Sequence, residues 1–439
     1  MALANAGWFA WQNATTPVAF IPHPRYSPKP LPEQLSVILG IRWKAKIPVV
    51  QKRTSSSNTR YTPAWILPTS DDDEYRAGPF VAILTSDGNR DFRGNKRNFI
   101  DIIRMGRKLG VTVFVVTPRG INPYTSSVRG YLLDDHGEKI RWIPATMPMP
   151  NIVYNRIPNR LSEKRHEEQD AIQFFLDTPG IQLFNPSFFD KWTLYEYLMN
   201  SDETQPFLPE TVQWNNGTEC RQLFQRHPIL FLKPVDGKAG LDMIRIIRKP
   251  NGYEVIHQTR NGKKRYHTTQ LKSLWQFLET LTYHRKYILQ QGIPLATYRN
   301  RPFDLRLLLQ KDGTGCWQVT GLGIRVAGQD AISTHVPMGG SIAPAPEVLR
   351  DVFRNRQSEI QEAIEQTALK IARHIETEKQ CNLGEMSMDL GIEQDGRLWF
   401  FEANAKPMKF DEPDIRHLSL ARLIHYCLYL SGFKQSKEA

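Results

Sequence analysis

The sequence predicts an α+β protein with several lobes, and three observations support this class. The chain has 439 residues, 40% of them hydrophobic, which is enough for two or three hydrophobic cores. From Phe80, strand and helix patterns alternate as in a parallel sheet. Farther along the chain, strands separated by Asn-Gly and Asp-Gly turns predict antiparallel sheets.

The net charge indicates which kinds of partner the protein could bind, and the cysteines indicate in which compartment it works. The formal net charge of +12 favours an anionic partner such as a nucleotide, an acidic peptide or a wall polymer, although a solvated basic surface would carry the same charge. No arginine-rich nucleic-acid motif accompanies it, so nucleic acid is not indicated. The four cysteines form no CxxC pair, and no apolar run is long enough for a membrane span. A cytoplasmic protein without a zinc site or disulfide framework is expected.

The first 185 residues divide into two regions. Residues 1–77 contain one apolar stretch, Leu35 to Val50, followed by a polar segment and the acidic run DDDE, which predicts a small β-rich appendage with a loose linker. Residues 78–185 predict a compact α/β domain with a mostly parallel sheet. Its glycines do not form GxGxxG, so no dinucleotide is implied.

Residues 186–436 predict a third, two-lobed domain. Its first lobe combines the helix KWTLYEYLM, the strand ILFLKPV, the loop DGKAG (236–240), two Asn-Gly hairpins and the strand YILQQGI. Its second lobe begins at FDLRLLLQ and contains one long amphipathic helix from Glu347 to about Lys379. Residues 385–405 then form a hairpin.

The hairpin carries the most informative side chains. Asp395-Gly396 is typical of a two-residue type I′ turn, which fixes the register of the flanking strands. Alternation then places Met388, Leu390, Ile392, Trp399 and Phe401 on one face and Ser387, Asp389, Glu402 and Asn404 on the other. Counting outward from the turn pairs Gln394 with Arg397, Ile392 with Trp399, Leu390 with Phe401, Asp389 with Glu402, and Ser387 with Asn404.

Two carboxylates directly opposite each other repel unless something neutralises them. A divalent cation would do so, and two carboxylates with an amide oxygen suit Mg²⁺. The hairpin therefore predicts a magnesium site at Asp389, Glu402 and Asn404, with an exposed acidic patch as the alternative.

Nucleotide-binding elements are less distinctive. There is no Walker A motif, but Lys233 ends a buried strand just before a loop in which Gly237 and Gly240 would let backbone amides approach phosphate. Asp190 is a plausible N-cap that would let Lys191 reach the same anion, although a plain surface lysine is the alternative. The strand YILQQGI offers backbone groups for an adenine edge, as an ordinary linking strand also would.

Taken together and in order, these motifs resemble the ATP-grasp superfamily. From about residue 80 to 430 their amino-acid sequences are similar to those of the YheC/YheD-type endospore coat-associated proteins. The segments that carry the resemblance are DKW (190–192), LFLKPVDGKAG (230–240), YILQQGI (287–293), FDLR (303–306), STHVPMGGSIAP (333–344), MSMDLGI (386–392) and FFEANAKP (400–407), with IVYNRIPNR upstream.

The resemblance implies an ATP-grasp bilobal fold after an α/β pre-ATP-grasp domain, with ATP and Mg²⁺ as cofactors. Lys191 and Lys233 would contact the phosphates, and residues 236–240 would close over them. The remaining residues with an implied ATP-binding role are Gly237, Lys238, Gly240, Gln290, Gln291 and Ile293, and the implied magnesium ligands are Asp389, Glu402 and Asn404.

Most members of that superfamily are carboxylate–amine ligases that act through an acylphosphate. Such chemistry needs buried positive charge, for which Arg306 and Arg325 are candidate catalytic residues, or else structural ion-pair partners. Arg156 and Arg160 are candidates for holding an acidic acceptor. The resemblance thus implies a ligase for an unidentified carboxylate and amine, such as a peptide, wall or coat component, associated with the endospore coat. The alternative is a nucleotide-binding structural coat protein without turnover.

Overall fold

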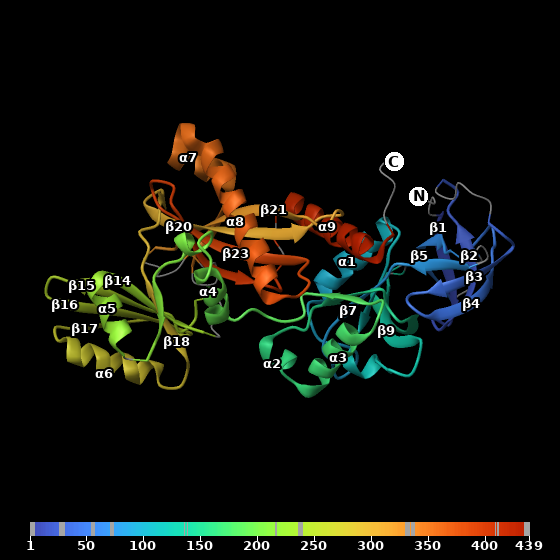
Figure 1. Ribbon diagram of the computed structural model, residues 1–439, viewed down its shortest axis with the longest axis horizontal. Helices are drawn as coiled ribbons and strands as arrows, with labels where there is room; N and C mark the ends of the chain where they lie inside the picture. Colours follow the sequence, from blue (N-terminus) through green and yellow to red (C-terminus); the bar gives the residue numbers. More distant parts are fainter. Residues whose placement is uncertain are drawn as a thin grey trace.

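The computed structural model describes residues 5–25, 31–53, 58–70, 74–135, 137, 139–215, 217–235, 240–329, 334, 339–408, 410 and 412–433. These residues form four β-sheets and the helices that cover them, so the predicted α+β class is confirmed. Figure 1 shows the sheets side by side along an elongated molecule, from the N-terminal sheet at one end to the small lobe that carries β14–β18 at the other.

The N-terminal sheet has the strand order β2-β1-β5-β6-β3-β4. Its strands are β1 (Asn5–Gln12), β2 (Thr16–Pro22), β3 (Gln34–Leu39), β4 (Trp43–Pro48), β5 (Thr59–Pro68) and β6 (Glu74–Gly78). Strands β5 and β6 thus occupy part of the region for which a loose linker was predicted.

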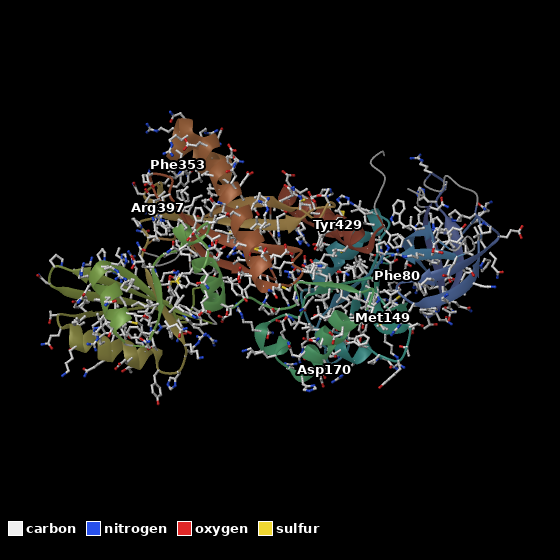
Figure 2. The ribbon with its side chains drawn as sticks, in the orientation of Figure 1. Phe80, Met149, Asp170, Phe353, Arg397 and Tyr429 are labelled. Carbon is white, nitrogen blue, oxygen red and sulfur yellow. The ribbon has the colours of Figure 1, made fainter. Side chains whose placement is uncertain are left out.

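This sheet also shares a hydrophobic core with the domain that follows. Phe9, Trp11 and Phe20 belong to the same buried cluster as Phe80 and Met149, and Figure 2 shows the last two at the junction between the two parts. The hydroxyl of Thr112 also donates to the carbonyl oxygen of Pro63 across the junction at 2.5 Å. The N-terminal sheet is thus attached to the next domain through a packed core.

The second sheet has the order β10-β9-β8-β7-β11-β12 and is mostly parallel, as predicted. The antiparallel strands β9 and β10 at its edge were not foreseen. The elements are β7 (Phe80–Leu84), α1 (Lys96–Lys108), β8 (Thr112–Val116), β9 (Ser127–Asp134), β10 (Arg141–Pro148), β11 (Ile152–Asn155), α2 (Arg160–Glu163), α3 (His166–Asp177) and β12 (Gln182–Phe184).

The small lobe is an antiparallel sheet with the order β13-β18-β14-β15-β16-β17 and its own hydrophobic core. Both predicted Asn-Gly hairpins are present, joining β15 to β16 and β16 to β17. The elements are β13 (Thr211–Gln213), α5 (Thr218–Arg226), β14 (Ile229–Pro234), β15 (Ile244–Lys249), β16 (Gly252–Thr259), β17 (Gly262–Thr268), α6 (Leu271–Thr282) and β18 (Tyr287–Gln291).

The large lobe is built on the sheet β22-β21-β20-β23-β24. The predicted single helix from Glu347 is wrong: α7 and α8 are separated at Arg354, whose φ of 51° is left-handed and does not continue a helix. The elements are α4 (Lys191–Met199), β19 (Thr297–Tyr298), β20 (Arg301–Lys311), β21 (Trp317–Val326), β22 (Ser341–Pro344), α7 (Ala345–Phe353), α8 (Gln357–Lys379), β23 (Glu385–Ile392) and β24 (Leu398–Asn404).

The last helix, α9 (Pro413–Ser431), joins the large lobe to the upstream domain. Its residues Ile424 and Leu428 pack in one cluster with Ile83 and Phe99 of that domain. On its other side the Arg422 guanidinium donates to the carbonyl oxygen of Val319 in β21 at 2.7 Å. Upstream domain and large lobe are therefore packed together, and the boundaries at residues 77 and 185 stay a prediction.

None of the helices among the described residues is long and apolar enough to cross a membrane.

Candidate functional site

A cavity of about 290 Å³ lies where the small lobe meets the large lobe. Strands β14, β15 and β18 line it from one side, and α4, β20, β21, β23 and β24 line it from the other. Besides the candidate catalytic residue Arg325, eight residues with a predicted role are in its wall: Lys191, Lys233, Gly240, Gln290, Gln291, Ile293, Asp389 and Glu402. Gly237 and Lys238 lie outside the described residues.

The two strands of the carboxylate hairpin pair Asp389 with Glu402 and Ser387 with Asn404, as predicted. The turn between them differs from the prediction, because Glu393 and Arg397 close a loop with three central residues rather than two. A β-bulge between Asp389 and Leu390 then absorbs the extra residue, so Leu390 pairs with Phe400. The two departures cancel, and both carboxylates remain opposite each other.

The bulge changes which aromatic side chains face the cavity. Phe401 was expected in the core with Leu390, but Phe400 packs in that core instead. Phe401 lines the cavity, to which Phe400 also contributes. Trp399, also expected on that face, donates its indole N–H to the Glu393 carboxylate at 2.7 Å. Gly391 leaves room for the Phe401 ring, since a Cβ atom at that position would overlap it.

Asp389 is 2% exposed and is held by two arginines. Arg306 donates from Nη1 to its Oδ1 at 2.7 Å, and Arg325 from Nη2 to its Oδ2 at 2.8 Å. Arg325 also forms a two-point ion pair with Asp304, at 2.8 and 2.6 Å. Burial alone would lower the pKa of Arg325, but the carboxylates of Asp389 and Asp304 outweigh it and raise that pKa, so the guanidinium stays charged.

Glu402 pairs with a lysine from the same side of the cavity. Lys191, the first residue of α4, lies 3.0 Å from Oε2 of Glu402, and Asn404 donates to Oε1 at 3.3 Å. Asp190 caps this helix as predicted, accepting from the amides of Trp192 and Thr193. The protein's own cations thus balance the facing carboxylates, and their repulsion no longer requires a metal ion.

The oxygen donors still suit Mg²⁺ chemically. Glu402 and Asn404 are partly exposed on one face of β24, and carboxylate and amide oxygens are the ligands that this ion prefers. Asp389 contributes a second carboxylate, although both of its oxygens already accept from arginines. Among the described residues, no three His, Cys, Asp or Glu side chains are grouped closely enough to hold a metal.

Lys233 reaches into the cavity from the end of β14. Its ammonium donates to Oε1 of Gln290 at 2.5 Å and lies 5.1 Å from the centre of the Phe401 ring. Burial lowers the pKa of Lys233 to about 8, with the charge of Lys191 acting in the same direction and the carboxylates of Glu402, Asp304 and Asp389 opposing it. An anionic ligand would therefore find a partly desolvated ammonium here.

The strand expected to present an adenine edge is largely committed to internal hydrogen bonds. The amide of Gln291 donates to Glu210 and that of Gly292 to Ile229, each at 2.8 Å. The Gln290 side chain accepts from Lys233 and donates to Thr211 at 2.9 Å. Gln290 and Gln291 line the cavity, yet the donors named here are used within the protein.

Arg156 and Arg160 do not reach the cavity wall. Arg156 is buried and donates to the Pro407 carbonyl at 3.0 Å and to Glu385 at 3.3 Å, and Arg160 donates to the Phe189 carbonyl at 2.9 Å. Both therefore connect the upstream domain to the large lobe, and the expectation that they hold an acceptor finds no support in their contacts.

Several residues of the cavity were missed. Most are apolar residues of strands or of the segments beside them, and in the sequence they resemble ordinary core: Leu208, Ile229, Phe231, Met243, Ile288 and Leu295. Arg245 was also missed, because an arginine on an alternating strand resembles a solvent-facing residue. Four cationic and three acidic side chains are among the described lining residues, so the wall has a positive excess that suits an anion.

The chain has two lobes that enclose a cavity lined by lysines and paired carboxylates, an arrangement typical of ATP-grasp proteins. A sequence model of the YheC/D-like ATP-grasp family matches residues 180–430. Because this match covers more than half of the chain, the chain belongs to the YheC/D-like ATP-grasp family. The resemblance inferred from the motifs is confirmed.

Two proteins of Bacillus subtilis (strain 168) are similar over most of their length. Endospore coat-associated protein YheD is 28% identical over 366 residues, which cover 81% of this chain and 79% of YheD. Endospore coat-associated protein YheC is 20% identical over 308 residues, which cover 70% of this chain and 84% of YheC. Among solved structures, D-alanine–D-alanine ligase from Bacillus anthracis complexed with ATP has a TM-score of 0.47 and 11% identity, covering 81% of this chain and 97% of that one.

Proposed function

We propose that the protein binds Mg-ATP in the cavity between its lobes and uses it to join a carboxylate to an amine. The observation that carries the proposal is the arrangement of Lys191, Lys233 and Arg325 around Asp389 and Glu402 in one cavity wall. Membership of an ATP-grasp family supports the choice of ATP as the anion.

In this proposal the triphosphate replaces two interactions within the protein, the ion pair of Lys191 with Glu402 and the hydrogen bond of Lys233 to Gln290. Lys191 and Lys233 turn from Glu402 and Gln290 toward phosphate oxygens, which supply a higher density of negative charge. Glu402, Asn404 and Asp389 would hold Mg²⁺ at this end of the cavity. The ion, when bound with the nucleotide, neutralises the phosphates and orients the terminal one for transfer.

The reaction itself has two steps. A substrate carboxylate oxygen attacks the γ-phosphorus of ATP, the bond to the β-phosphate oxygen breaks, and ADP leaves, which yields an acylphosphate. An amine then attacks the acyl carbon and loses a proton, and phosphate departs. Arg325 is placed to stabilise the negative charge that develops on transferred oxygens, because it lines the cavity and remains charged.

Arg306 is better assigned to positioning. It contacts Asp389 and Ser387 but is not among the residues of the cavity wall. We propose that it fixes the carboxylate of Asp389 rather than contacting substrate.

A second candidate is a nucleotide-binding structural protein of the endospore coat. The observation that favours it is Asp389, whose two oxygens are both occupied by arginines, so that binding can occur here without the metal ligation that turnover needs. The two similar Bacillus proteins are named for coat association, and we propose the same association for this chain.

The deciding experiment measures ADP release by the purified protein with Mg²⁺, ATP and a pool of amino acids and wall peptides, with mass spectrometry of the products. Glu402→Ala should abolish Mg-dependent release, whereas the matched control Glu362→Ala, on the exposed surface of α8, should not change it. Release that depends on an acceptor and forms a new amide mass supports the ligase. ATP binding without release under any acceptor supports the structural protein, and unchanged Mg-ATP affinity in Glu402→Ala contradicts the metal assignment.

A further inference from the structure

Arg245 is a cavity residue to which neither the motifs nor the family resemblance assigns a role. It lies on β15, directly opposite Phe231 of β14, and both residues line the cavity. The guanidinium carbon of Arg245 is 6.0 Å from the centre of the Phe231 ring. The side chain therefore lies along an aromatic wall of the cavity rather than in solvent.

The hydrogen-bonding capacity of Arg245 is incompletely used. Its Nε is buried and lacks a hydrogen-bond partner among the described residues. The carboxylate that acts on it, Glu254, already pairs with Arg265 at 3.4 Å and with Lys249 at 3.7 Å. A buried donor left without an acceptor is costly, so the position is explained if a ligand supplies the acceptor.

The place of Arg245 along the sheet separates it from the phosphate end. Gln290, Phe231 and Arg245 form one row across β18, β14 and β15. Lys233 lies two residues farther along β14 than Phe231, shortly before residues 236–240. At the usual rise per residue of a strand, this separates Lys233 from the row by about 6.6 Å. If Lys233 contacts phosphate, Arg245 faces the nucleoside.

Other donors in this row and in the residues that follow Gln290 already have partners. Both ends of the Gln290 amide have partners, and the backbone amides of Gln291 and Gly292 donate to Glu210 and Ile229. Among the described residues of the row, Arg245 is the one with a buried donor still unmatched.

We propose that Arg245 recognises the base of the bound nucleotide by donating a hydrogen bond to a ring nitrogen of a purine. The inference rests on nucleotide binding as proposed above and adds the residue that reads the base. A guanidinium has five N–H donors and no acceptor, so it selects for acceptor atoms. The adenine ring nitrogens N1, N3 and N7 are such acceptors, while Phe231, Met243 and Phe401 provide apolar surface for the faces of the base.

The test combines one substitution with nucleotide analogues that lack single acceptor atoms. Binding of ATP, 1-deaza-ATP, 3-deaza-ATP and 7-deaza-ATP is measured by calorimetry for the wild-type protein, Arg245→Met and the control Arg248→Met. Arg248 is exposed on the same strand, so its loss should leave all affinities unchanged. The wild type should bind one analogue at least about tenfold more weakly than ATP, as expected for a charge-assisted hydrogen bond, and Arg245→Met should bind that analogue and ATP equally.

Inorganic tripolyphosphate separates base recognition from phosphate binding and also reports a folded cavity. Arg245→Met should bind it as the wild type does. A loss of tripolyphosphate affinity equal to the loss for ATP, or an analogue penalty that persists in Arg245→Met, would overturn the inference while leaving ATP binding intact. Absence of ATP binding by the wild type would instead refute the proposed function, and the inference with it.

Discussion

Arg325 and Asp389 form an ion pair of 2.8 Å in the cavity wall, with 9% and 2% of their side chains exposed. The same guanidinium also holds Asp304, so one cation balances two buried carboxylates. Such a cluster is stable only while it is complete, because each charge has lost its hydration.

Substitution of Arg325 should therefore destabilise the fold as well as the site. Arg325→Met leaves the buried Asp304 without its cation and Asp389 with Arg306 alone, and it is expected to lower the free energy of unfolding by about 3–5 kcal/mol. Arg306→Met, which removes a more exposed partner of Asp389, should cost less. Urea unfolding followed by circular dichroism measures both values, and equal losses would contradict the central place of Arg325.

The lowered pKa of Lys233 should make nucleotide binding depend on pH. Its pKa of about 8 lies below the 10.5 of an ordinary lysine, so in the unliganded protein the ammonium is lost as pH rises through about 8. A phosphate binds the charged form, and ATP affinity should consequently be highest below pH 8 and fall above it. Titration calorimetry between pH 6.5 and 9.5 should show this fall in the wild type and in Lys272→Met, an exposed lysine of α6, but not in Lys233→Met. An identical fall in Lys233→Met would assign the titration to another group.

The shared core predicts that the N-terminal sheet is required for folding. A chain that begins at residue 79 would expose Phe80, Phe114 and Met149, which are fully buried against that sheet. We expect it to lose the cooperative thermal transition of the upstream domain and to aggregate, because large buried apolar surfaces would face water. A soluble, cooperatively unfolding truncated protein would show instead that residues 1–77 form an independent unit.

Replacing Gly396 in the hairpin turn by alanine should lower the stability of the fold. Its φ is 97°, and a Cβ atom there would lie 2.5 Å from Cδ1 of Ile360. Gly262 has a similar φ of 110° but open space around the same position, so Gly262→Ala carries the backbone strain alone. Gly396→Ala should destabilise by about 1–2 kcal/mol for the left-handed backbone and by a further steric amount that Gly262→Ala lacks. Equal losses in thermal or urea unfolding would mean that Ile360 moves aside without cost.

Local patterns were sufficient to predict much of this molecule. The βαβ order and both Asn-Gly hairpins follow from periodicity and turn residues. The pairing of Asp389 with Glu402 was predicted correctly only because the bulge offsets the longer turn. The roles of the predicted site residues stay predictions, although most of the described ones lie together in one cavity wall.

What the sequence could not reveal depends on contacts between distant segments. The ion pairs of Asp389 join β23 to β20 and β21, and no local pattern specifies that register. The end of α7 at Arg354 lacks a proline or glycine that would mark it, and the apolar spacing continues through it. The unmatched donor of Arg245 is visible only once its neighbours are placed.

The bulge beside Asp389 also constrains how relatives of this chain can differ in length. Adding or removing one residue in the turn, without a compensating change at the bulge, would rotate Glu402 to the opposite face of β24 and away from Lys191. Homologous hairpins that keep both carboxylates in the cavity must therefore conserve the spacing between them, or change it at two places together. The number of residues between Asp389 and Glu402 is accordingly a better indicator that both carboxylates face the cavity than the identity of any residue in the turn.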